Sequence, residues 1–121
     1  MIFVVDDSDV VRSVVRKALN LYGYNEVEDA VDGLDALNKA KNIHDQIEMY
    51  VLDVNMPNMD GISLVGEVRK FDPTTPIIML TTETDKSKMV KAKGLGATGW
   101  IIKPFDAEKF IKVVEMFLKK Q

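Results

Sequence analysis

Residues 49–57 hold the clearest chemical signal in the sequence, an acid at the end of an apolar run. Residues 49–52 are apolar on both faces, as in a fully buried strand, and Asp53 follows them directly. Pro57 then forces the chain out of regular structure. In an open parallel sheet, ligands bind in the crevice outside the carboxyl ends of the strands, so we expect Asp53 to be functional.

Three other apolar runs also end in side chains that can bind charged groups: Asp6 and Asp7 after residues 2–5, Thr81 after residues 77–80, and Lys103 after residues 100–102. If these runs are strands of one sheet, three carboxylates meet, and each resists ionisation without compensation. Lys103 offsets one negative charge, and a divalent cation would offset the others. Oxygen-only ligands in an open cleft suit Mg²⁺, which keeps several of its waters.

Carboxylates, a hydroxyl, an ammonium and Mg²⁺ together fit phosphoryl transfer, which depends mostly on positioning and on neutralising the phosphoryl oxygens. We expect Asp53 to be the nucleophile and to form an aspartyl phosphate. Taken singly, Asp6 and Asp7 could merely cap the helix that follows, and Lys103 could be a solvated charge. Their joint placement beside Asp53 favours the functional interpretation.

Five strand-like runs alternate with five helical patterns along the chain. Strands are expected at residues 2–5, 24–30, 49–53, 77–80 and 100–102, and helices at 9–22, 34–40, 62–68, 85–95 and 107–120. Three strands are apolar on both faces, which predicts a parallel sheet covered by helices on both sides. The most acidic strand, the second, belongs at an edge. With right-handed crossovers, these features predict an α/β, doubly wound five-stranded sheet of order 2-1-3-4-5.

Length and composition are those of an ordinary globular protein. We expect one domain over residues 1–121, with 46% hydrophobic and 29% charged residues. A net charge of −3 argues against nucleic-acid binding, and no apolar run approaches the roughly 20 residues of a membrane span. Residues 1–5 enter a strand without a basic leader, so we expect a cytoplasmic protein without an N-terminal truncation, and the C-terminus stays open.

The chain resembles the receiver domain of two-component response regulators, and in size it is nearest to the stand-alone, CheY-like chemotaxis type. The motifs that carry the resemblance are Asp6-Asp7, Asp53 with Met56-Pro57 and Gly61 after it, Thr81, and Lys103-Pro104-Phe105. The resemblance implies a flavodoxin-like or CheY-like fold. The order 2-1-3-4-5 is the strand order known for flavodoxin and CheY, so its prediction rests in part on this resemblance. The resemblance also raises the expectation of a cis bond before Pro104.

By this resemblance, Asp53 would take its phosphoryl group from a phosphohistidine on a sensor histidine kinase or phosphotransfer protein. Asp6 or Asp7, together with Asp53 and the carbonyl of Asn55, would hold Mg²⁺. Asn55 and Glu83 lie two residues beyond Asp53 and Thr81, positions that tune hydrolysis in the family. An amide and a carboxylate that can orient water would give a short-lived phosphoryl state.

Lys103 and Thr81 would each bind a phosphoryl oxygen, with Thr81 moving toward it; Thr82 competes for this role. Trp100 would then swing inward and remodel the face made by the fourth helix, the fifth strand and the fifth helix, where a downstream target docks. Trp100 replaces the family's usual Tyr or Phe, so simple packing of the indole is the alternative.

Four lysines crowd the fourth helix and its approach: Lys86, Lys88, Lys91 and Lys93. They form either a solvated face or an electrostatic docking surface for an acidic partner segment. His44 stands alone, without metal-ligand spacing, and is expected at the surface.

The sequence thus predicts a phosphorylation-activated switch that signals by binding another protein, with chemotaxis suggested by its stand-alone size. It would act on no outside substrate, although it would promote its own phosphorylation and dephosphorylation. One alternative is a Mg²⁺-dependent aspartyl phosphatase, but such enzymes commonly carry Asp-x-Asp and this chain has Asn55. A second is a degenerate receiver that binds a partner constitutively, although every acid, Thr and Lys position is filled.

Overall fold

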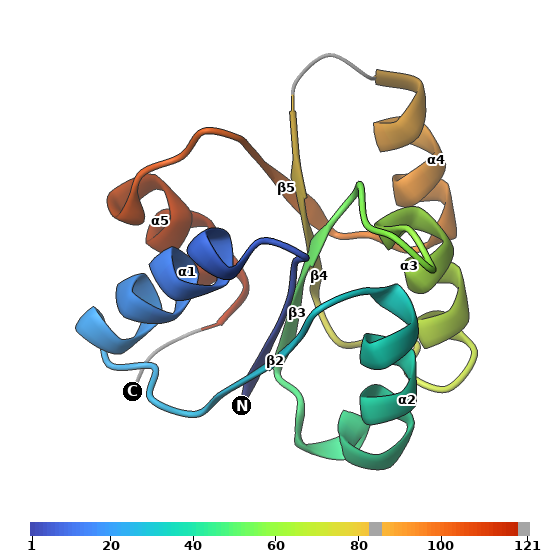
Figure 1. Ribbon diagram of the computed structural model, residues 1–121, viewed down its shortest axis with the longest axis horizontal. Coiled ribbons are helices and arrows are strands. Elements are labelled where there is room, and N and C mark those ends of the chain that lie inside the picture. Colours follow the sequence, from blue (N-terminus) through green and yellow to red (C-terminus); the bar gives the residue numbers. More distant parts are fainter. Residues whose placement is uncertain (83–85, 119–121) are drawn as a thin grey trace.

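A five-stranded parallel sheet forms the centre of the molecule (Figure 1). The computed structural model describes residues 1–82 and 86–118. The strands are β1 (Ile2–Val5), β2 (Val27–Ala30), β3 (Met49–Asp53), β4 (Ile77–Thr81) and β5 (Gly99–Ile102). Their order is β2-β1-β3-β4-β5, which confirms the predicted topology.

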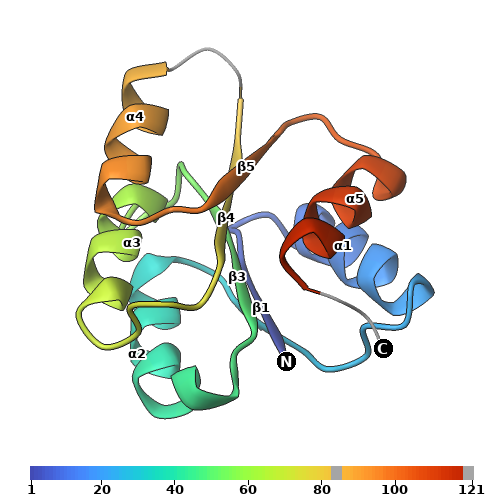
Figure 2. The same cartoon turned by 180° about the vertical axis from the view of Figure 1, so that it is seen from behind.

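Helices cover both faces of this sheet. They are α1 (Asp9–Leu21), α2 (Gly33–Ile43), α3 (Gly61–Arg69), α4 (Lys86–Leu95) and α5 (Ala107–Phe117), with a short 3₁₀ turn at His44–Gln46. Helices α1 and α5 pack together on one face, and α2, α3 and α4 follow one another on the other (Figure 2). Among the described residues, no helix has the length and apolar character needed to cross a membrane.

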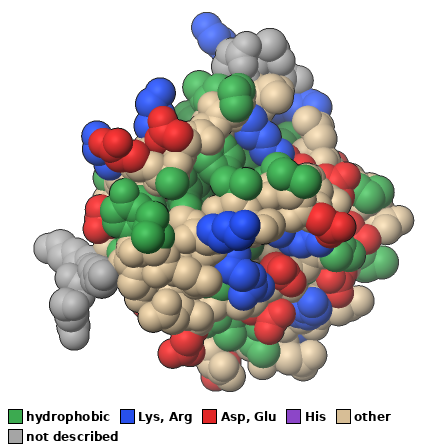
Figure 3. Space-filling view, turned by 60° about the vertical axis from the view of Figure 1, so that its left-hand side comes forward, with side chains coloured by type: hydrophobic (Ala, Val, Ile, Leu, Met, Phe, Trp, Pro, Cys, Tyr) green, Lys and Arg blue, Asp and Glu red, His purple; other side chains and the backbone are tan. Residues whose placement is uncertain are grey.

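The three central strands form the core, because helices bury them on both sides. Every residue of β1, β3 and β4 is buried, whereas the edge strand β2 is only partly so. One apolar cluster lies under α1 and α5, and a second lies under the other three helices. On the face shown in Figure 3, acidic and basic side chains are interspersed, with apolar side chains exposed between them.

Side-chain caps set the start of four helices, and each cap accepts a hydrogen bond from the amide three residues ahead: Ser8, Asp32, Asp60 and Asp106. Such caps satisfy amides that have no partner inside the helix. All four follow the carboxyl ends of strands or the loops that leave them. They therefore fix the loops that surround the predicted site.

Several element bounds differ from the sequence-based expectation. Strand β2 begins at Val27 rather than at residue 24, because only residues 27–30 pair with β1. Helix α5 ends at Phe117 rather than at residue 120, since Leu118 has an extended backbone and closes the helix. Val10 and Val14 continue the apolar pattern of α1 in the sequence, yet they are 71% and 44% exposed, because only one side of α1 meets the sheet and α5.

A buried polar network joins the ends of three elements at the edge of the sheet opposite the predicted site. The hydroxyl of Tyr50 donates to Asp72 Oδ2 at 3.1 Å, and the hydroxyl of Thr75 donates to Asp72 Oδ1 at 2.8 Å. Arg69 donates to the carbonyls of Asp72 and Gly96 at 2.9 and 2.8 Å. The network holds the turn after α3 against β3 and the loop before β5.

We expect Asp72→Asn to lower the free energy of unfolding by about 1–2 kcal/mol at pH 7. Burial alone would raise the pKa of Asp72, but the hydrogen bonds from Thr75 and Tyr50 outweigh it and hold that pKa below its ordinary value. Because this folded pKa lies below the unfolded value of about 3.9, the ionised carboxylate stabilises the fold at neutral pH. That stabilisation is lost as the pH falls from the unfolded pKa through the folded one. Urea unfolding at pH 7 and pH 3 should show the gap from wild type closing in acid. A gap that stays constant would contradict a charged Asp72.

Candidate functional site

Four strand ends bring the predicted side chains to one edge of the sheet. Asp6 follows β1, Asp53 ends β3, Thr81 ends β4 and Lys103 follows β5. Asp6 and Asp53 are only 0% and 5% exposed, and Thr81 is also buried, whereas Asp7 is exposed. The structure therefore assembles the charged cluster that the sequence predicted, with two of its carboxylates removed from solvent.

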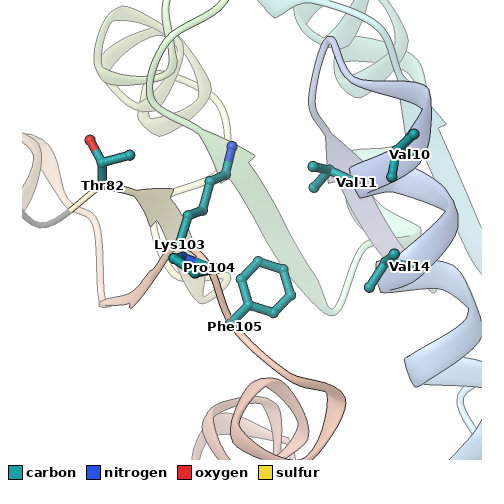
Figure 4. Close-up of a pocket in the computed structure, with 7 residues that line it drawn as sticks. All are labelled: Val10, Val11, Val14, Thr82, Lys103, Pro104 and Phe105. Carbon is teal, nitrogen blue, oxygen red and sulfur yellow. The ribbon is translucent and has the colours of Figure 1, made fainter.

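Lys103 bridges the two buried acids. Its Nζ donates to Asp53 Oδ1 at 2.9 Å and to Asp6 Oδ2 at 3.1 Å. Figure 4 shows its side chain extending from the end of β5 toward the end of β3. Burial alone would lower the pKa of Lys103, but the hydrogen bonds and charges of both acids outweigh it and raise that pKa. The ammonium therefore stays charged. The peptide bond between Lys103 and Pro104 is cis, as the family resemblance led us to expect.

The surroundings of Asp53 disfavour its ionised form. Burial raises its pKa, and so do the charges of Asp6 and Asp7, while the hydrogen bond from Lys103 acts in the opposite direction. One ammonium thus does not compensate the three acids, and a further cation would relieve the site. The three residues can each offer a carboxylate oxygen, with all three oxygens within 4.8 Å of one another. This oxygen-only, strongly anionic donor set fits Mg²⁺.

Asp6 is held more firmly than the sequence indicated. Its Oδ1 accepts a hydrogen bond from the amide of Ser8 at 2.9 Å, while its Oδ2 accepts from Lys103. Arg12 donates to the Asp6 carbonyl at 2.6 Å, a contact that was not predicted from the sequence. The position of Arg12, one turn into the helix that follows two acids, could have indicated this contact.

Gly61 explains the geometry of the loop that follows Asp53. A Cβ at position 61 would lie 2.0 Å from the backbone oxygen of Asp53, so only glycine fits this close approach. The Gly61 amide also donates to the carbonyl of Val54 at 2.8 Å. The start of α3 is thereby packed directly against the backbone of the candidate nucleophile.

Gly61→Ala is expected to destabilise the fold by about 2–3 kcal/mol, because Asp53 or α3 must shift to admit the methyl group. Gly94→Ala is the matched control: a Cβ there meets nothing within 4 Å, and α4 should gain about 1 kcal/mol. Urea unfolding of both variants checks the pair. Equal effects at positions 61 and 94 would contradict the close approach.

The remaining predicted residues lie around this cluster. The Thr81 hydroxyl donates to the carbonyl of Thr82 at 2.9 Å, whereas Thr82 itself is exposed. Asn55 is exposed, and its side-chain oxygen accepts from Lys88 Nζ at 3.3 Å, a contact that the sequence analysis did not foresee. Trp100 is half-buried and packs against the core cluster beneath α2, α3 and α4. Glu83 lies outside the described residues.

The lysines of α4 are exposed, whereas His44 is only partly exposed. All four of these lysines lie on α4 and are exposed, which fits both a solvated face and a docking surface. His44 is half-buried, with its ring 5.0 Å from that of Phe71 between centroids.

Apolar side chains border the cluster on the α1 side. A pocket of about 360 Å³ lies between α1 and the loop after β5, and its lining combines apolar side chains with the stem of the bridging lysine (Figure 4): Val10, Val11, Val14, Thr82, Lys103, Pro104 and Phe105. The two exposed valines of α1 therefore face a hollow beside the charged residues.

Comparisons with known proteins agree with this geometry. A family model for the response regulator receiver domain matches residues 2–115. The chemotaxis protein CheY of Treponema pallidum is 31% identical over 98% of this chain and 82% of its own length. The structure of chemotaxis response regulator CheY4 of Vibrio cholerae covers 97% of both chains, with 43% identity and a TM-score of 0.89.

A chain in the crystal structure of the CheX–CheY–BeF3–Mg²⁺ complex from Borrelia burgdorferi is also similar. It is 30% identical with a TM-score of 0.91, and the match covers 98% of this chain and 89% of that one. The family match spans nearly the whole sequence and every strand that supplies a residue to the site. This chain therefore belongs to the response regulator receiver domain family and is a CheY-like receiver of two-component signalling.

Proposed function

We propose that Asp53 is the phosphoacceptor and that its donor is a phosphohistidine on a sensor histidine kinase or phosphotransfer protein. An oxygen of Asp53 bonds to phosphorus while the phosphorus–nitrogen bond breaks, and the donor imidazole leaves with the electron pair. The observation that carries this proposal is the Lys103 ammonium 2.9 Å from a buried carboxylate at the carboxyl edge of the sheet. A cation at that position can neutralise a phosphoryl oxygen.

The metal site would use Asp53, Asp6 or Asp7, and the carbonyl of Asn55. Mg²⁺, when bound there, supplies positive charge to the phosphoryl oxygens. The closeness of the three carboxylates supports this proposal, because their mutual repulsion favours a cation. Asn55, whose side chain is exposed, and Glu83 would tune hydrolysis by orienting water.

Thr81 and Trp100 would carry the signal away from the site. To bind a phosphoryl oxygen, the Thr81 hydroxyl must give up its hydrogen bond to the Thr82 carbonyl. Trp100 lies one strand further out, on β5, and borders a pocket of about 400 Å³ that also includes Phe105 and Lys109. A downstream target would dock on the face of α4, β5 and α5, with the α4 lysines favouring an acidic segment.

We also propose that residues 1–121 act as a single receiver domain in the cytoplasm, without a nucleic-acid or membrane partner and without an outside substrate. Self-catalysed phosphorylation and dephosphorylation would be its only reactions. Chemotaxis is the proposed pathway, because similar proteins carry that name.

Trp100 fluorescence during titration with Mg²⁺, and then with beryllofluoride, tests the proposal in wild type and Asp53→Ala. Beryllofluoride with Mg²⁺ stands in for the phosphoryl group on a carboxylate. A change on each addition that requires Asp53 is the expected result. If the Trp100 fluorescence does not change, calorimetric titration measures Mg²⁺ binding and mass spectrometry after treatment with acetyl phosphate measures phosphorylation. Absence of both metal binding and phosphorylation would overturn the proposed function.

A further inference from the structure

The loop that joins β3 to α3, residues 54–60, has an attachment outside the charged cluster. Asn58 in this loop has φ +67°, a left-handed backbone that residues other than glycine rarely adopt. Its side-chain amide Nδ2 donates to Asp32 Oδ2 at 2.7 Å. Asp32 lies 26 residues earlier, at the start of α2, so the bond ties together two loops that are distant in sequence.

Both oxygens of Asp32 are in use. Oδ1 accepts from the Asp35 amide at 2.8 Å and caps α2, while Oδ2 holds Asn58. The hydrogen bonds from Asp35 and Asn58 hold the pKa of Asp32 below its ordinary value. The carboxylate therefore stays ionised at neutral pH, the state that accepts both bonds.

The backbone contacts at this point are equally close. A Cβ on Gly33, the first residue of α2, would lie 2.1 Å from the Met59 carbonyl oxygen. The Met59 amide in turn donates to the Pro57 carbonyl at 2.7 Å. The start of α2 and the β3–α3 loop therefore pack as one unit, and Figure 1 shows both at the same end of the sheet.

The contact between α2 and this loop links the β1 side of the charged cluster, which holds Asp6 and Asp7, to the β3 side, which holds Asp53. Asp32 follows β2, which pairs with β1, and β1 leads into Asp6 and Asp7. The loop that contains Asn58 follows Asp53 directly and includes Asn55. A shift of the loop relative to α2 would move Asn55 away from the acids on the β1 side.

We infer that Asp32 is a positioning residue for the metal site, because its bond to Asn58 fixes the loop that presents the Asn55 carbonyl beside Asp53. The inference rests on the proposed function, which makes that carbonyl a ligand. Asp32 itself touches neither the metal nor the phosphoryl group. Outer contacts of this kind orient ligands, and their loss commonly weakens metal affinity by about tenfold or more.

Two variants break the bond from opposite sides. Asp32→Ser keeps a capping oxygen for α2 and removes the one that holds Asn58. Asn58→Gly keeps the left-handed backbone and removes the amide. We expect either change to weaken Mg²⁺ binding about tenfold in calorimetric titration, while the rate of phosphorylation at saturating Mg²⁺ stays near wild type. The double variant should bind Mg²⁺ no more weakly than either single one.

Asp106→Ser is the matched control, because Asp106 caps α5 by accepting from the Lys109 amide at 2.8 Å and lies in a different loop. Its Mg²⁺ dissociation constant should stay within about twofold of wild type. Wild-type Mg²⁺ affinity in both folded single variants would overturn the inference, as would losses that add in the double variant. A wild-type protein that binds no Mg²⁺ would instead overturn the proposed function, and this inference with it.

Discussion

Replacing Asp53 by Asn is expected to reduce phosphoryl incorporation from acetyl phosphate to background while leaving the fold intact. The amide is a poor nucleophile, so no acyl phosphate can form. The substitution also removes one of three crowded anions, and Lys103 keeps its hydrogen bond to Asp6 at 3.1 Å. Burial and the neighbouring acids disfavour the ionised form of Asp53, so we expect the free energy of unfolding in metal-free buffer to rise by about 1–2 kcal/mol.

Intact-mass spectrometry measures the incorporation, and urea unfolding measures the stability. Asp45→Asn, at an exposed acid on the 3₁₀ turn, is the control and should incorporate phosphate as wild type does. A phosphoryl adduct on Asp53→Asn would place the acceptor at another residue. A marked loss of stability would show that the Asp53 carboxylate supports the fold rather than strains it.

Lys103→Met is expected to destabilise the metal-free protein by about 2–4 kcal/mol. Breaking a buried ion pair from one side leaves an uncompensated charge, and here two carboxylates at 0% and 5% exposure lose their shared cation. The loss should be smaller than for a fully buried pair, because the Lys103 side chain is 23% exposed and water partly screens its charge. Mg²⁺ should stabilise this variant more than wild type, since the added cation meets acids that nothing else offsets.

The double variant Asp53→Asn/Lys103→Met measures the interaction energy between Asp53 and Lys103, apart from the effect of each residue alone. We expect it to recover much of the stability lost in Lys103→Met, because only Asp6 then remains buried without a cation. Urea unfolding in EDTA, repeated with saturating Mg²⁺, completes the cycle. A Lys103→Met protein as stable as wild type in EDTA would show that the two acids are neutral in the native state.

Sequence patterns predicted the central strands well because burial on two faces leaves a continuous apolar run. β3 begins and ends where the sequence indicated, and the acid at its end lies in the crevice that a parallel sheet creates. Edges and termini were harder to predict. Val10 and Val14 continue the apolar stripe of α1, but the width of the buried face depends on which elements pack against it, and α5 and the sheet cover only part of it.

Periodicity, turn residues and strand-end acids are local signals, so the sequence predicted the elements and the charged residues of the site. The predicted strand order rested in part on the family resemblance. The long-range contacts became visible only in the folded structure: Lys103 donates to both Asp6 and Asp53, and Asn58 donates to Asp32. Such contacts join residues whose distance along the chain carries no information about their distance in space. They depend on loop paths that close packing selects, and no period or composition encodes those paths.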